Sequence, residues 1–180
     1  MLGFFRKKEI DTRLLKQNIT DVVIEIWQDP SMLPFEKFNS FVEYGKLIKS
    51  EKPPSMFYRE KLRYTLCVAM ILLFKIDAGE EDIAEIIEEI KNQVHVIDAP
   101  NANSICVALG LKAHKYTEIR FATNAKSAGK AIERRFSEEA FGFCPSDDDV
   151  DRRYTLYKTL SSFERDSIFK VSAAIRKSKV

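Results

Sequence analysis

The sequence predicts an all-α fold, a single globular domain of about seven or eight helices that spans residues 1–180. Three observations favour this class. Only 6 glycines and 6 prolines occur among the 180 residues, too few for the many turns of an all-β protein. Apolar residues recur at helical spacings of three and four along most of the chain. Hydrophobic residues make up 45% of the chain and charged residues 31%, a composition typical of one domain with its own core.

The stretch from Tyr64 to Phe74 is the centre around which we expect the other helices to pack. No residue from 66 to 74 is polar, and a helix that is apolar on every side has to be enclosed on every side. A buried strand is the alternative, because periodicity does not distinguish the two over so short a run. Apolar residues upstream continue the helical spacing and favour a central buried helix over about residues 56–76. The run is shorter than the roughly 20 apolar residues that cross a bilayer.

A first helix is expected from about residue 11 to residue 28, where Pro30 pushes the residue before it out of the helical region. A second, aromatic-rich helix is expected from about residue 31 to residue 48. It carries more aromatic surface than one helical stripe buries, and such surface is enriched at interfaces. We therefore weigh a core and dimer interface against a groove for a partner. The candidate interface residues are Phe35, Phe38, Phe41 and Tyr44.

A strongly amphipathic helix is expected over residues 80–91, with isoleucines on one side and acids on the other. Seven acids and two bases lie between Lys75 and Lys91. One interpretation is a docking surface for a basic partner. The other is a solvated face whose acids lie near the favourable N-terminal end of the helix.

Residues 102–121 fit the spacing of a helix-turn-helix. That motif has a glycine with positive φ at its turn and apolar residues that pack the second helix onto the first. Gly110 stands at the offset of the turn. The exposed side of the second helix would then present Lys112, His114 and Lys115 to a DNA groove. A plain helical hairpin with a glycine turn fits the same pattern.

The stretch from 112 to 135 is basic, with seven cations and two acids. Three of the cations form one row at helical spacing, which can follow a phosphate backbone, meet an acidic helix of another protein or a second copy, or remain solvated. The candidate contacts for a nucleic acid or an acidic partner are Lys112, His114, Lys115, Arg120, Lys126, Lys130 and Arg134.

Two more helices are expected near the C-terminus, and capping patterns at Ser146 and Ser161 predict where they begin. In the first of them Val150, Tyr154 and Tyr157 are predicted to form the buried stripe. In the last helix Ile168, Val171 and Ile175 are predicted to face inward. The acids at 147–149 suit the first turn of a helix and lack the spacing of a calcium loop.

Two features predict a cytoplasmic protein. Residues 1–8 lack the long apolar stretch of a signal peptide. Their short apolar tip and three cations allow contact with a membrane surface, but a membrane-bound helix needs a longer amphipathic stretch, so we expect the tip to pack onto the core. Cys67, Cys106 and Cys144 are odd in number and far apart, as is typical of free thiols in a reducing compartment.

A search for catalytic motifs finds no histidine pair, phosphate-binding glycine loop or nucleophile elbow. We therefore expect no catalytic residue, metal, cofactor or small-molecule substrate. The leading prediction is a non-enzymatic, cytoplasmic protein-binding or regulatory protein that acts through amphipathic helical faces and self-associates. The alternative is a DNA-binding regulator that uses residues 102–121 and the flanking basic helix. A third hypothesis is an enzyme whose site assembles from distant residues.

Overall fold

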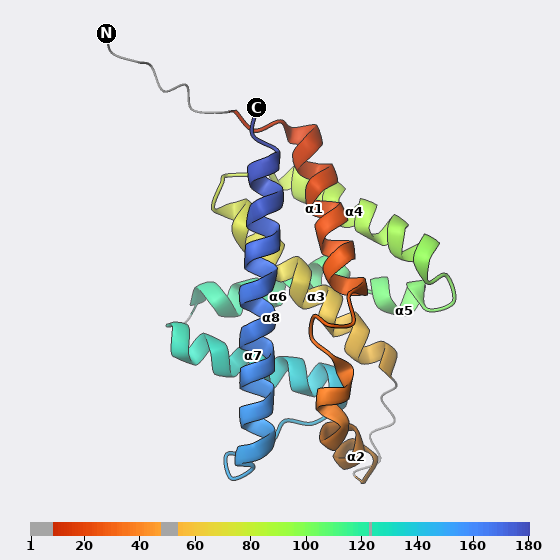
Figure 1. Ribbon diagram of the computed structural model, residues 1–180, viewed down its shortest axis with the longest axis vertical. Coiled ribbons are helices and arrows are strands. Elements are labelled where there is room, and N and C mark those ends of the chain that lie inside the picture. Colours follow the sequence, from red (N-terminus) through yellow and green to blue (C-terminus); the bar gives the residue numbers. More distant parts are fainter. Residues whose placement is uncertain (1–8, 48–53, 123) are drawn as a thin grey trace.

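The computed structural model describes residues 9–47, 54–122 and 124–180, and it confirms the all-α class (Figure 1). In chain order the helices are α1 (Thr12–Gln28), the 3-10 helix η1 (Phe35–Phe38), α2 (Asn39–Leu47), α3 (Pro54–Phe74), α4 (Glu80–Ile97), α5 (Ala102–Cys106), α6 (Leu109–Ala122), α7 (Ala125–Phe141) and α8 (Val150–Lys177). Among the described residues, β pairing is limited to a single bridge between Ile10 and Lys179.

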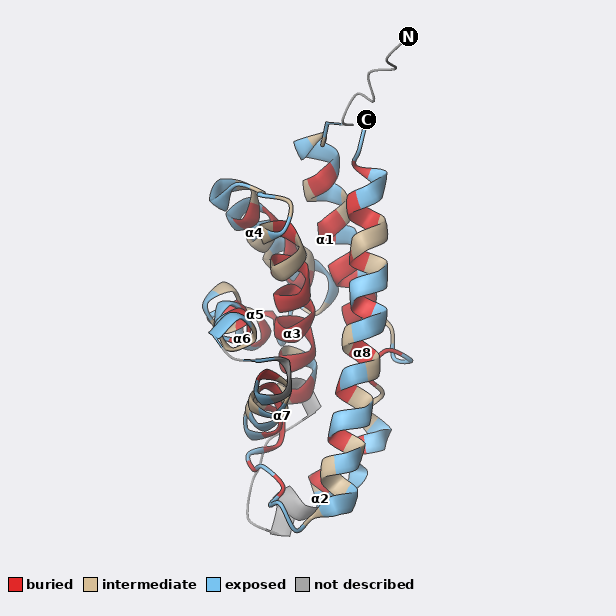
Figure 2. Ribbon diagram, turned by 90° about the vertical axis from the view of Figure 1, so that its left-hand side faces the viewer, coloured by how far each residue is buried: buried red, intermediate tan, exposed pale blue. Residues whose placement is uncertain are grey.

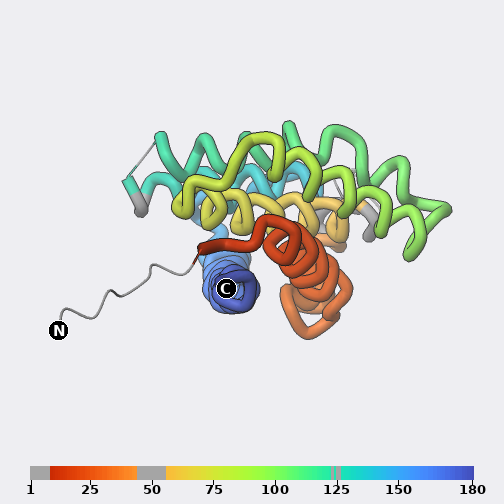
Figure 3. Tube along the Cα trace, turned by 90° about the horizontal axis from the view of Figure 1, so that it is seen from above, coloured from red at the N-terminus to blue at the C-terminus, as the bar shows by residue number. Residues whose placement is uncertain are grey.

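Helix α3 is the centre of the fold, as predicted. It contacts α1, α5, α6, α7 and α8. It lies between a layer of α1 and α8 on one side and a layer of α4, α5, α6 and α7 on the other (Figures 2 and 3). Ten consecutive residues, 61–70, are buried on all sides, which is the enclosure that an apolar helix requires. The helix begins and ends two residues earlier than expected.

The first helix begins and ends as predicted. The side chain of Asp11 caps α1 by accepting a hydrogen bond from the backbone N–H of Leu14 at 3.0 Å. The indole N–H of Trp27 donates to the backbone carbonyl of Tyr58 at 3.1 Å and joins the end of α1 to α3. Beside the start of α1, the N–H of Asp11 donates to the carbonyl of Ser178 at 2.9 Å, so the two ends of the described chain lie together.

The aromatic segment before α3 belongs to the core. Phe38 and Phe41 are fully buried, and both rings pack on Phe141 of α7, with centroid distances of 5.3 and 5.1 Å. The partner-groove interpretation is therefore wrong for these two residues, because their rings fill the space between α2 and α7. Phe35 is half-buried, and the side chain of Tyr44 lies outside the described residues.

The C-terminal region differs most from expectation. Residues 150–177 form one long helix instead of two. Its buried stripe runs through Leu156, Leu160 and Phe163. The sequence contains a second stripe at Val150, Tyr154 and Tyr157, which lies roughly a third of a turn away around the helix, and the core covers only one of the two. The second stripe is exposed. In the later turns Val171 and Ile175 face inward as predicted, but Ile168 is 39% exposed.

No helix among the described residues is long and apolar enough to cross a membrane.

Candidate functional site

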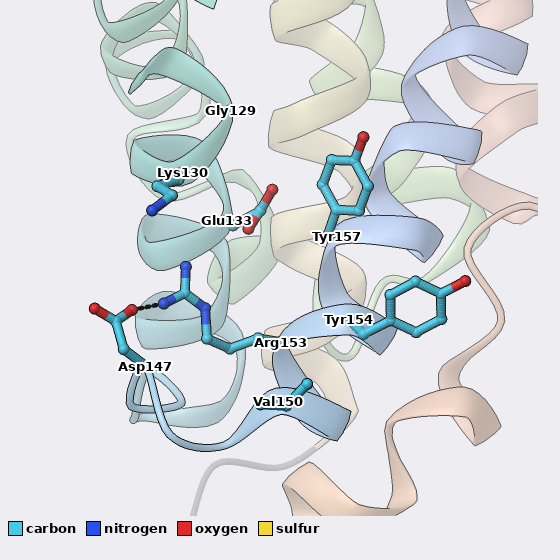
Figure 4. Close-up of a pocket in the computed structure, with 8 residues that line it drawn as sticks. All are labelled: Gly129, Lys130, Glu133, Asp147, Val150, Arg153, Tyr154 and Tyr157. Carbon is cyan, nitrogen blue, oxygen red and sulfur yellow. Dashed lines mark ion pairs between the residues drawn. The ribbon is translucent and has the colours of Figure 1, made fainter. Parts of the chain in front are cut away.

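A hollow of about 860 Å³ lies between α7 and the first turns of α8 (Figure 4). We call it the α7–α8 groove. It is lined by Gly129, Lys130, Glu133, Asp147, Val150, Arg153, Tyr154 and Tyr157.

One wall of the groove is the exposed stripe of α8. Asp149 fixes the start of this helix, because its carboxylate accepts a hydrogen bond from the N–H of Arg152 at 3.3 Å. Val150, Tyr154 and Tyr157 follow at spacings of four and three and are 68%, 60% and 56% exposed. Tyr157 faces the space beside α7, whereas Tyr154 points to the outer side of α8 (Figure 4). Large apolar and aromatic side chains gathered in this way mark an interaction surface.

The other wall is one face of α7. Asn124 caps α7 by accepting from the N–H of Ser127 at 3.0 Å. Gly129 and Glu133 then lie one helical turn apart, next to Lys130. A Cβ atom placed on Gly129 meets no other atom within 4 Å, so the glycine leaves this part of the groove open.

Charged groups occupy the floor and one end of the groove. The guanidinium of Arg153 forms an ion pair with the carboxylate of Asp147 (Figure 4). Partial burial raises the pKa of Glu133, against the opposing effect of the positive charges of Arg153 and Lys130. Lys130 is exposed and forms no ion pair with any described residue. The ammonium of Lys158 lies 5.7 Å from the ring centroid of Tyr154, within cation–π distance.

Two smaller hollows adjoin the groove. One, of about 410 Å³, shares Lys130 and Arg153 with it and extends to Cys144. The other, of about 440 Å³, shares Tyr154 and reaches Leu33 before η1. The first turns of α8 therefore border three adjoining hollows, which together extend beyond the α7–α8 groove.

The structure does not bring the predicted basic contacts together on one free face. Four of them form ion pairs: Lys112 with Glu139 at 3.2 Å, His114 with Glu118 at 3.5 Å, Arg120 with Glu164, and Arg134 with Glu138 at 2.9 Å. Lys115 is exposed on α6, and Lys130 lines the α7–α8 groove. The side chain of Lys126 lies outside the described residues.

The predicted helix-turn-helix has its turn at a different place. The chain turns at Val107 and Ala108, where Ala108 has a φ of 50°. Gly110 lies inside α6, and a Cβ atom there would approach Cδ1 of Ile87 to 3.2 Å. The glycine therefore serves the close approach of α6 to α4, and its assignment to the turn was wrong. The first helix of the pair, α5, has only 5 residues.

Sequence reasoning missed two groups of residues. The tyrosines of α8 were expected in the core, although a phenol hydroxyl suits a half-wet position better than a buried one. The other group is on α3, where Glu60, Lys61 and Arg63 are all buried. These residues precede the apolar run, and the sequence did not predict their burial, because charged residues are rarely buried unless they are paired.

Within the described ranges, no three His, Cys, Asp or Glu side chains are placed to hold a metal ion. The three cysteines carry free thiols. Comparison with known proteins finds no matching family, curated protein or solved structure.

Proposed function

We propose that this chain is a non-enzymatic protein-binding module and that the α7–α8 groove holds a segment of its partner. The observation that supports this most is the exposed stripe of Val150, Tyr154 and Tyr157 on the wall of an open hollow. Tyrosine offers a large apolar surface and a polar hydroxyl, and it is enriched where proteins meet. The expectation that the protein is not an enzyme rests on the sequence.

The groove favours a partner segment of a particular chemistry. An apolar or aromatic side chain of the partner fits beside Tyr157 and over Gly129, where the surface is open. A carboxylate next to that side chain complements Lys130, a cation of the groove that forms no ion pair with the described residues. We therefore propose a segment that combines apolar and acidic residues.

The proposal includes a regulatory role in the cytoplasm and self-association, both of which follow from the sequence. Free thiols at Cys67, Cys106 and Cys144 suit a reducing compartment.

A DNA-binding regulator remains the second hypothesis. Nucleic-acid affinity comes largely from cations that replace counterions on phosphates. At Arg120 and Arg134 a DNA phosphate has to displace a carboxylate of the same chain first. These ion pairs favour the protein partner over DNA.

The test compares variants of one residue. Gly129→Ala is the matched control, because alanine fits the open space and favours the helix by about 1 kcal/mol. Gly129→Trp places a large ring in the groove. Tagged full-length proteins are used to isolate partners from cells that express the chain, and each partner is then purified and titrated against the variants.

We expect wild type and Gly129→Ala to bind the same partner with equal affinity, and Gly129→Trp to lose at least tenfold. Tyr157→Ala should lose a similar amount, since truncating a central aromatic costs about 2 kcal/mol or more. Equal binding by all four proteins rejects the groove as the site. Retention of random duplex DNA at roughly tens of micromolar, lost in Lys115→Glu, supports the DNA hypothesis instead.

A further inference from the structure

A second site involves charged side chains where α3, α6 and α7 meet. Three of them are on α3 and the others on α6 and α7. The charged cluster consists of Arg59, Glu60, Arg63, Lys112, Arg135 and Glu139.

In the buried half of the charged cluster, on α3, Glu60 contacts both arginines. Its side chain is 1% exposed, and one carboxylate oxygen pairs with both Arg63 and Arg59. The other oxygen accepts a hydrogen bond from the hydroxyl of Tyr116 at 3.0 Å. Arg63 is 2% exposed, and its second terminal nitrogen donates to the carbonyl of Val107 at 2.7 Å. The positions of these groups are therefore fixed from three elements.

Glu139 joins the other half. Its carboxylate lies 3.2 Å from the ammonium of Lys112 and 3.8 Å from the guanidinium of Arg135. The guanidinium of Arg135 also lies 5.4 Å from the ring centroid of Tyr116, which connects it to Glu60 through the tyrosine. Lys112 and Arg135 are each about a quarter to a third exposed, so solvent reaches the charged cluster from the α6–α7 side.

The positive charges of the charged cluster exceed the negative ones. Its ion pairs link four cations to two carboxylates, which leaves a formal charge of +2. Lys112 and Arg135 share the single carboxylate of Glu139 on the side that solvent reaches, so an anion from solvent can balance the excess there. The Nε–H groups of Arg63 and Arg135 are also buried without a hydrogen-bond acceptor, although buried donors nearly always have one. Both observations favour a site for an anion.

We propose that the charged cluster binds a small oxyanion of charge −2, a phosphoryl group. Its two negative charges balance the excess, and its oxygens accept the unpaired N–H groups that guanidinium groups direct at phosphate. Arg59, Arg135 and Lys112 approach the surface, and Arg63 forms the inner end. The charged cluster shares α7 with the α7–α8 groove but none of the residues that line it, and the anion site does not depend on the proposed function.

The experiment measures thermal unfolding of the full chain in millimolar phosphate and in sodium chloride of equal ionic strength. A bound anion stabilises the folded state by mass action, and we expect phosphate to raise Tm by roughly 3–5 °C at nine-tenths occupancy. Equilibrium dialysis should find one phosphate per chain. Equal Tm values in the two salts and no retained phosphate overturn the proposal, whatever the variants do.

Two variants separate binding from general salt effects. Arg135→Gln removes one cation of the charged cluster and should abolish the phosphate response. Arg165→Gln removes an exposed arginine of α8 that pairs with Asp166 and Ser162 of its own helix, and it should keep the full response. A response that is the same in both variants reflects exclusion of phosphate from the surface and contradicts the site.

The source of the phosphoryl group is found with two probes. Inorganic phosphate and O-phosphoserine are titrated against the wild type under the same conditions. Tighter binding of inorganic phosphate by tenfold or more assigns the site to the free ion, and comparable binding assigns it to phosphorylated side chains. Failure of both probes overturns the proposal.

Discussion

Single residues of α3 carry charges into the core, and Lys61 is the clearest case. Its side chain is fully buried, and its ammonium donates to the backbone carbonyl of Asp29 at 2.6 Å. That carbonyl follows the last turn of α1, where carbonyls lack helical partners and a positive charge is favourable. Burial nevertheless lowers the pKa of Lys61 to about 8, and the charge of Asp29 offsets only part of this effect.

The lowered pKa predicts a pH dependence of stability. Between about pH 8 and pH 10.5 the unfolded chain keeps the proton of Lys61 while the folded chain has lost it, so this residue makes stability rise with pH in that window. The contribution is roughly 3 kcal/mol from a shift of this size. Below pH 8 the folded protein bears the full cost of the buried charge.

Urea unfolding at pH 7.5, 9 and 10.5 checks this for wild type and Lys61→Met. As the pH rises, the free energy of unfolding of the wild type should increase by a few kcal/mol relative to that of Lys61→Met. Lys115→Met, at an exposed lysine of α6, is the control and should show a constant difference. A constant difference for Lys61→Met as well would mean that Lys61 titrates normally in the folded protein.

Among the elements, α3 was predictable and α8 was not, for a physical reason. Residues 66–74 offer no polar face, so only full enclosure suits them. Residues 150–163 offer two apolar stripes, and the choice between them depends on what α8 packs against. The aliphatic stripe with Leu156 and Leu160 is buried, and the tyrosine stripe remains outside. Helix propensity and residue spacing do not predict which of the two stripes is buried.

A pair of aspartate substitutions tests the enclosure of α3. Met70 is 5% exposed, whereas Leu111 on α6 is 61% exposed. Met70→Asp buries an unpaired charge and should abolish cooperative melting, because the cost of several kcal/mol approaches the whole stability of a domain. Leu111→Asp should change stability by only about 0.5 kcal/mol. Circular dichroism melts of both variants decide the matter, and a normal melt of Met70→Asp contradicts the central position of α3.

The backbone conformation between α5 and α6 predicts how two substitutions change the stability of the protein. Ala108 holds a left-handed conformation that costs an L-residue about 1–2 kcal/mol, so Ala108→Gly should stabilise the protein by about 1 kcal/mol. Gly110→Val should destabilise it by roughly 1–3 kcal/mol through its clash with Ile87. Denaturant midpoints measure both effects. If Ala108→Gly destabilises and Gly110→Val is neutral, the turn is misplaced.

At the scale of the whole molecule, acids of α4 and cations of α7 lie on separate parts of the surface. Acids such as Glu81 and Glu89 line a hollow of about 770 Å³ between α1 and α4. Lys130 and Arg134, the latter paired with Glu138, lie on α7, which is well separated from α4 (Figure 1). Surfaces that differ in this way on one chain favour head-to-tail contacts between copies.

Sedimentation velocity tests self-association. At low micromolar concentration we expect a species larger than the 20.8 kDa chain. About 0.3–0.5 M salt should dissociate it, because exposed charges are screened beyond a few ångströms under those conditions. Glu89→Lys should also weaken it, whereas Phe169→Ser, at an exposed position of α8, should not. A monomer at every concentration removes self-association from the account.

The candidate site was only partly predictable from sequence. Lys130 was singled out because it belongs to a basic row at helical spacing. The groove that it lines forms because α7 and α8 are neighbours in the fold and because Tyr154 and Tyr157 lie outside the core. Both depend on contacts distant in sequence, such as the packing of Phe163 on Tyr64 with centroids 5.8 Å apart. The pairing of Lys112 with Glu139 is likewise a product of the α6–α7 packing.

The α7–α8 groove is tested most directly by hydroxyl-radical footprinting of the full chain, alone and in complex with its captured partner. Tyr154 and Tyr157 are exposed in the free chain and should be oxidised readily there and protected severalfold in the complex. Phe169, 70% exposed elsewhere on α8, should be oxidised equally in both. Unchanged oxidation of the two tyrosines on binding, with protection appearing at Leu111 and Phe121 of α6 instead, would contradict the assignment of the groove.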